Sequence, residues 1–116
     1  MRDWALRSAG LLAVFVALAH GVLAELKVFA SARIEPRSTR RLLRLIWQAS
    51  TVDWIGIGVL LVVAPSLAPG PARTWIAAVA IAVYSYAAVG NALATRTWHP
   101  GWILMTVVVG LAFAGL

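Results

Sequence analysis

Long apolar runs separated by short polar segments dominate the pattern along this chain. Charged residues are absent from Ser8–Ala19 and from Thr74–Thr95, and Asp53 is the one acidic residue between Leu42 and Ala64. A helix needs about 20 mainly apolar residues to cross the hydrocarbon core of a bilayer. The pattern therefore predicts four membrane-spanning helices, over 4–29, 42–64, 74–95 and 98–116.

The segments between these runs are short and contain helix-breaking residues. The second connection, PSLAPGPAR, is rich in proline and glycine, and we expect Pro65, Pro69, Gly70 and Pro71 to end the second helix. Pro100 marks the start of the fourth helix. Because short connections force consecutive helices to run antiparallel, we expect one all-α domain over 1–116, a polytopic membrane protein folded as an up-and-down four-helix transmembrane bundle.

Positive charge is concentrated around the first connection, SARIEPRSTRR. The basic residues there are Lys27, Arg33, Arg37, Arg40, Arg41 and Arg44, against Arg73 alone near the second connection. Cytoplasmic loops carry the excess of lysine and arginine. We therefore expect a multi-pass protein of a bacterial-type inner membrane, with the first and third loops cytoplasmic and both termini outside. Four of these arginines are expected to bind anionic lipid headgroups: Arg37, Arg40, Arg41 and Arg44.

Composition agrees with a membrane protein. The chain of 116 residues is 62% hydrophobic and 12% charged, whereas a soluble domain has about 25% charged residues. The net charge of +6 is gathered around one loop, which favours membrane topology over nucleic-acid binding. The chain has no cysteine, which excludes disulfides, thiolate metal sites and thiol nucleophiles.

The N-terminal segment has a second interpretation. Arg2 and Arg7, the apolar run and the small residues at 17–19 also resemble a signal peptide cleaved before His20. Motifs for phosphate, dinucleotide or paired-histidine metal binding are absent from the sequence. Their absence disfavours an enzyme and predicts no metal site and no cofactor.

Several polar side chains fall inside the predicted spans, all toward their cytoplasmic halves. A charged group in the hydrocarbon core is costly and marks a functional site by default. At 1.5 Å per residue, Asp53 lies about 13 Å beyond Arg44, near the bilayer midplane. We expect Asp53 to pair with His20 within one substrate- or proton-binding cluster. The candidate residues of that cluster are His20, Glu25, Gln48, Asp53, Tyr84 and Asn91.

Angular position divides the polar residues of the first helix. Ala17, His20 and Ala24 share one face, whose small residues favour close packing against neighbouring helices. Glu25 lies about 140° round from His20, so the two should have different partners unless the helix is distorted near Gly21. Structural roles are the alternatives: an interhelical hydrogen bond for His20 and an interfacial ion pair for Glu25.

Three features follow one another in the chain: His20 in the first span, the basic connection, and the segment RRLLRLIWQASTVDWIGIGVLL, in which Arg41–Leu45 begin the second span. With these features in this order, this part of the chain resembles membrane heme-handling proteins. These include the oxygen-independent protoporphyrinogen oxidase and the copper-resistance D-type proteins. The resemblance covers about half the chain and implies heme or porphyrin chemistry with His20 as an axial ligand. The third span lacks the lysine of the oxidase family, and His20 and His99 lie at different depths, so they make a poor pair of ligands to one heme.

Three functions remain open on this basis. The first is a proton-coupled or small-substrate transport or binding unit that acts as a homo-oligomer. The second is a heme or porphyrin-handling protein. The third is an accessory structural subunit of a larger membrane complex.

Overall fold

The computed structural model describes residues 1–67 and 70–116, and in these ranges the chain is helical with short connections and no strand. The helical elements in order are α1 (Arg2–Leu23), the π-helix η1 (Ala24–Val28), α2 (Phe29–Ser31), α3 (Arg37–Leu67), α4 (Pro71–Thr95) and α5 (Pro100–Ala114). The first three join into one rod over Arg2–Ser31. The prediction of an all-α chain is confirmed.

Three helices are long and apolar enough to cross a membrane: Arg2–Ser31, Arg37–Leu67 and Pro71–Thr95. The fourth, α5, is apolar but has 15 residues, which at 1.5 Å per residue extend about 22 Å. That length is shorter than the hydrocarbon core of about 30 Å. The span predicted over 98–116 is therefore shorter in the structure, because His99 and Pro100 delay the start of the helix.

The helix boundaries differ from the prediction at both ends of α3. The helix begins at Arg37 rather than at residue 42, since arginine and leucine are good helix formers, and Arg37, Arg40 and Arg41 therefore lie on helical turns. Pro65 was predicted to end the helix, which is wrong, because α3 continues to Leu67. A proline removes one backbone hydrogen bond, and here the last turn tolerates that loss.

The next helix begins as its sequence predicts. Gly70 adopts a positive φ of 71° directly before α4, and Pro71 occupies the first turn. Glycine reaches this backbone region without steric cost, and proline is favoured at a helix start. Pro69, also predicted to break the chain here, lies outside the described residues.

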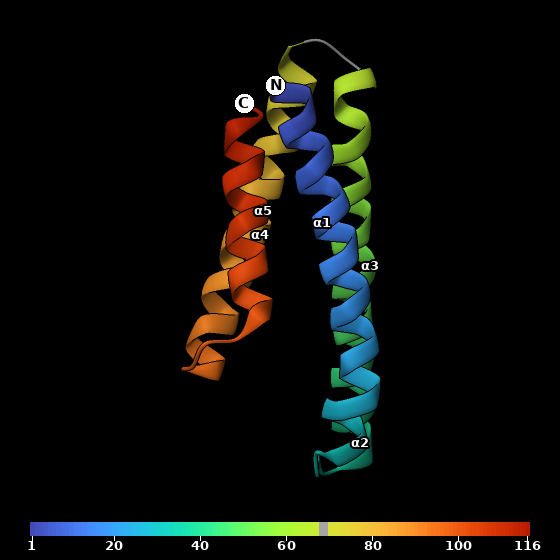
Figure 1. The fold of residues 1–116 in the computed structure, drawn as a ribbon. Helices are drawn as coiled ribbons and strands as arrows, with labels where there is room; N and C mark the ends of the chain where they lie inside the picture. Colours follow the sequence, from blue (N-terminus) through green and yellow to red (C-terminus); the bar gives the residue numbers. More distant parts are fainter. Residues whose placement is uncertain (68–69) are drawn as a thin grey trace.

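The helices form two pairs, which come together at the end of the molecule where both the N-terminus and the C-terminus lie (Figure 1). In the figure α1 runs alongside α3, α4 runs alongside α5, and the two pairs diverge toward the lower end. Polar contacts fasten the upper end: Arg73 forms an ion pair of 2.5 Å with Asp3, and Arg7 donates a hydrogen bond of 2.9 Å to Ser66 Oγ. The ion pair therefore joins the two helix pairs at this end, whereas the hydrogen bond lies within the α1–α3 pair.

Small residues allow the helices to approach closely. The largest buried cluster draws on all four long elements and consists of Leu6, Ala9, Ala13, Leu61, Ala77, Ala80, Tyr84, Val108 and Ala112. One close approach joins α1 to α3, where a Cβ built on Gly10 would lie 2.4 Å from the carbonyl oxygen of Gly58. Small residues at such crossings are typical of helix packing in membranes.

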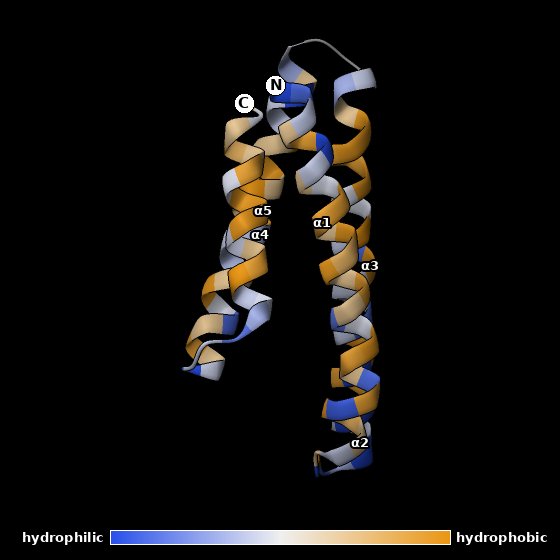
Figure 2. Cartoon of the chain, viewed as in Figure 1, coloured by the Kyte–Doolittle hydropathy of each residue, from blue (hydrophilic) through white to orange (hydrophobic). Residues whose placement is uncertain are grey.

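Hydrophilic residues gather where the α1–α3 pair extends past α4 and α5. Figure 2 shows this lower end with several strongly hydrophilic turns, whereas the middle of each helix is mainly apolar. The exposed apolar side chains of these middle segments include Phe15, Leu18, Val79 and Val89. The polar end and the divergence of the two pairs together define the region of the candidate site.

Candidate functional site

A cleft of about 640 Å³ lies between the α1–α3 pair and α4. His20, Trp47, Ser50 and Trp54 line one wall, and the other wall consists of Ala82, Val83, Tyr86, Ala87, Gly90, Asn91 and Ala94. Small-molecule sites in proteins have volumes of about 300–1,000 Å³ and are mainly apolar with a few polar groups. Among the described residues that line it, none is charged, so the cleft suits a neutral molecule.

His20 is held by two tryptophans from α3. Its ring stacks on that of Trp47 with the centroids 4.7 Å apart, and lies 4.5 Å from the ring of Trp54. Trp47 Nε1 also donates to the carbonyl oxygen of His20 at 3.3 Å. Because Trp47 and Trp54 are two helical turns apart, their rings hold the imidazole from two sides and fix its orientation.

Ser50 completes this wall. Its Oγ lies 3.4 Å from His20 Nε2 and donates a hydrogen bond of 2.7 Å to the carbonyl oxygen of Trp47. Residues three and seven positions apart share one helix face, which places Trp47, Ser50 and Trp54 together against His20.

The α4 wall provides space and a single amide. Asn91 donates from Nδ2 to the carbonyl oxygen of Ala87 at 2.9 Å, and its Oδ1 lies 3.9 Å from the position of a Cβ built on Gly101 at the start of α5. A Cβ built on Gly90 would contact nothing within 4 Å. Tyr86 is 85% exposed at the opening. The small side chains of α4 are therefore what gives the cleft its volume.

Tyr84 has a different place from the one predicted. It is buried, and its hydroxyl donates a hydrogen bond of 2.7 Å to the carbonyl oxygen of Trp54. The rings of Tyr84 and Trp54 also meet edge to face. Tyr84 therefore positions Trp54 from behind and does not line the cleft.

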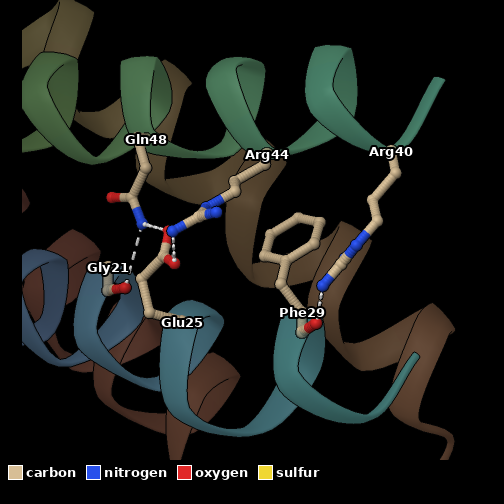
Figure 3. Close-up of polar contacts among 6 residues, drawn as sticks. All are labelled: Gly21, Glu25, Phe29, Arg40, Arg44 and Gln48. Carbon is tan, nitrogen blue, oxygen red and sulfur yellow. Dashed lines mark hydrogen bonds and ion pairs between the residues drawn. The ribbon is translucent and has the colours of Figure 1, made fainter. Parts of the chain in front are cut away.

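Glu25 and Gln48 form a second polar group below the cleft (Figure 3). Gln48 Nε2 donates to Glu25 Oε1 at 2.8 Å and to the carbonyl oxygen of Gly21 at 3.1 Å. Arg44 donates from Nε to Glu25 Oε1 at 3.0 Å and forms an ion pair of 2.5 Å with Oε2. Glu25 stands in the π-helical turn, and such turns are frequent at functional sites. His20 and Glu25 thus have separate partners.

The predicted headgroup arginines lie at the start of α3. Arg40 donates to the carbonyl oxygen of Phe29, and its guanidinium lies 5.9 Å from the centre of that ring. Arg37, Arg41 and Arg44 line, with Arg40, an open groove of about 590 Å³. The first two turns of α3 therefore present one basic surface.

Asp53 is not part of the cleft. It is exposed on α3 and makes no hydrogen bond or ion pair with any residue in 1–67 or 70–116. Asp53 follows the buried Thr51 by two residues, which places it about 200° round the helix, on the side opposite α1. The predicted pair of Asp53 and His20 is therefore wrong.

Three residues of the site, Trp47, Ser50 and Trp54, were not among the predicted candidates, although their spacing of three and four residues places them on one helix face. His99 caps α5 by accepting from the backbone N–H of Gly101 at 3.1 Å. Of the predicted site residues, His20 and Asn91 line the same cleft. Glu25 and Gln48 are hydrogen-bonded to each other outside it, and Asp53 lies on the exposed side of α3.

Comparison with protein-family models, with curated proteins and with solved structures finds no match to this chain.

Proposed function

We propose that this chain is a membrane-embedded unit that binds, and in its cellular setting transports, a small neutral molecule through the cleft between α3 and α4. The cleft itself carries the proposal: its volume of about 640 Å³ suits a small ligand. Its polar groups, His20, Ser50 and Asn91, are uncharged or titratable near neutrality. The ligand class is therefore a mainly apolar molecule with one or two hydrogen-bonding groups.

The chain's arrangement in the membrane is part of this proposal. We place the three long helices and α5 as an up-and-down bundle in an inner membrane, with the basic end of the α1–α3 pair on the cytoplasmic side. Both termini then lie outside. The cleft opens toward the cytoplasmic half, while the ion pair of Asp3 and Arg73 closes the outer end.

Each wall has a distinct role in binding. His20, fixed by Trp47 and Trp54, presents a ring edge with a hydrogen-bonding nitrogen. Asn91 contributes an amide group to the opposite wall. The apolar body of the ligand lies along the small residues of α4. Because Asp53 is remote from His20, a proton relay between the two is not included.

Heme is not the ligand that this geometry favours. The ring of His20 is held by two tryptophans, and its Nε2 faces Ser50 Oγ at 3.4 Å, so an iron at Nε2 would need the serine to move. We expect the purified protein to be colourless, and a Soret band in its absorption spectrum would contradict this.

The test is photolabelling of the purified protein in detergent with 4-hydroxybenzophenone, a neutral apolar probe with one hydroxyl group. We expect the label on peptides that contain Trp47–Trp54 or Ala82–Ala94. Gly90→Leu places a larger apolar side chain on the α4 wall, where an added Cβ meets nothing within 4 Å, and should abolish the label. Gly110→Leu is the matched control, because Gly110 is equally open but lies on α5. Undiminished labelling of the Gly90→Leu protein would refute the proposal.

A further inference from the structure

The outward face of α3 carries a regular row of exposed residues. Leu42, Ile46, Ala49, Asp53, Gly56 and Leu60 are all exposed in the single copy, and they follow one another at spacings of four and three residues. This alternation is the spacing of residues that meet a partner helix in a left-handed coiled coil. The row lies opposite the side of α3 that packs on α1.

Asp53 makes this face unusual within the chain. It lies near the middle of α3, 16 residues after Arg37 and 14 before Leu67. It is the one charged residue in the central parts of the three long helices, over 8–24, 45–67 and 74–95. A carboxylate that faces lipid without a partner is strongly unfavourable. The face therefore needs a partner with a group that satisfies Asp53.

Small residues lie on both sides of Asp53. A Cβ on Gly56, like one on Gly90 or Gly110, would meet nothing within 4 Å. Ala49 and Gly56 flank Asp53 on the same face, and small residues let a second helix approach closely.

We propose that this face, which we call the Asp53 face, binds the same face of a second copy in a parallel pair of α3 helices. Copies with the same membrane orientation are related by a two-fold axis along the membrane normal, which brings the two Asp53 side chains together. One protonated carboxyl then donates its hydrogen bond to the other carboxylate. The pair holds one proton and one negative charge, so it is complementary to itself.

The basic residues of a second copy do not offer an alternative partner. Arg7 and Arg73 lie at one end of the helices, and the cluster from Lys27 to Arg44 lies at the other. Within 8–24, 45–67 and 74–95 a copy in the same orientation has no lysine or arginine that could pair with Asp53. The inference rests on the membrane location proposed above and not on ligand binding in the cleft.

The test uses single cysteines, since the chain contains none of its own. Ala49→Cys and Gly56→Cys probe the face, and Val59→Cys and Gly110→Cys are exposed controls away from it. In membrane vesicles treated with copper phenanthroline, the first two should yield a cross-linked product at twice 12.4 kDa, and the controls should not. Asp53→Leu should weaken association about tenfold, the effect of one interhelical polar contact, whereas Asp53→Asn should largely retain it.

Other results of these experiments would contradict either the pairing of the two copies or the membrane location. If the chain resists carbonate extraction and Ala49→Cys and Gly56→Cys form no dimer, the paired face is refuted while the membrane location stands. A cross-link to a protein of another mass assigns the face to a different partner and refutes the second copy. If carbonate releases the chain from the vesicles, both the membrane location and the pairing fail. Photolabelling of the Asp53→Leu protein tests ligand binding in the cleft independently of the pairing of two copies.

Discussion

Adding one methyl group at Gly10 should force α1 and α3 apart. A Cβ at this position would lie 2.4 Å from the carbonyl oxygen of Gly58 and 2.7 Å from Val62. Ordinary carbon–oxygen contacts are about 3.3–3.6 Å, so the two backbones must separate by roughly 1 Å. The Gly58 atom in this contact is a backbone carbonyl oxygen. It cannot rotate away as a side chain could, so the whole helix has to shift.

The expected cost follows from overpacking, which typically destabilises a core by about 1–3 kcal/mol. A glycine-to-alanine change in a helix also gains helix propensity, about 1 kcal/mol in soluble hosts. Gly110→Ala separates these two effects, because Gly110 lies in α5 with nothing within 4 Å of an added Cβ. The propensity gain is common to both variants, so their difference measures the clash alone.

The assay is reversible unfolding by SDS titration in mixed micelles, followed by far-UV circular dichroism. We expect the free energy of unfolding of the Gly10→Ala protein to be about 1–3 kcal/mol below that of the Gly110→Ala protein. Adding Gly58→Ala to Gly10→Ala should cost less than Gly58→Ala alone, since both changes open the same contact. Equal stability of the Gly10→Ala and Gly110→Ala proteins would show that the helices do not cross at these glycines.

Three further predictions concern the polar contacts around the cleft. Tyr84→Phe removes the hydrogen bond to Trp54 and should lower the free energy of unfolding by about 0.5–1.5 kcal/mol in the same titration; an unchanged value would contradict that contact. Glu25→Arg should destabilise the protein and Arg44→Glu in the same chain should restore it, because the ion pair is re-formed with reversed polarity, and failure of the second change to rescue the first would count against the pair. The double variant Arg37→Gln, Arg41→Gln should retain less brominated anionic phospholipid, measured as quenching of tryptophan fluorescence, while Arg2→Gln should leave the quenching unchanged. Equal quenching in the unmodified protein, the double variant and the Arg2→Gln protein would contradict the assignment of these arginines to lipid headgroups.

The helices themselves could be predicted from the apolar runs, because a long run without charge has few other stable structures in a membrane protein. Their ends were harder to place. Arg37 to Arg41 are polar and so were assigned to a loop, although arginine favours a helix once Leu42 and Leu43 continue it. The π-helical turn at Ala24–Val28 depends on partners from α3, and a local pattern does not contain that information.

The orientation of α3 shows why Asp53 was misplaced. Because apolar residues stand on the exposed side of α3 as well as on its packed side, hydrophobic periodicity does not distinguish the two sides. The side that packs on α1 is marked instead by small residues, Thr51 and Gly58, both of which are buried. Counting from these two residues places Asp53 on the opposite side.

The two helix pairs are joined by the ion pair of Asp3 with Arg73 at the end near the termini and by the hydrogen bond of Tyr84 with Trp54 beside the cleft. Beyond these contacts the pairs diverge (Figure 1), and His20 and Asn91 lie on opposite walls of the cleft. A small change in the angle between the pairs therefore changes the separation of His20 and Asn91 more than that of Asp3 and Arg73.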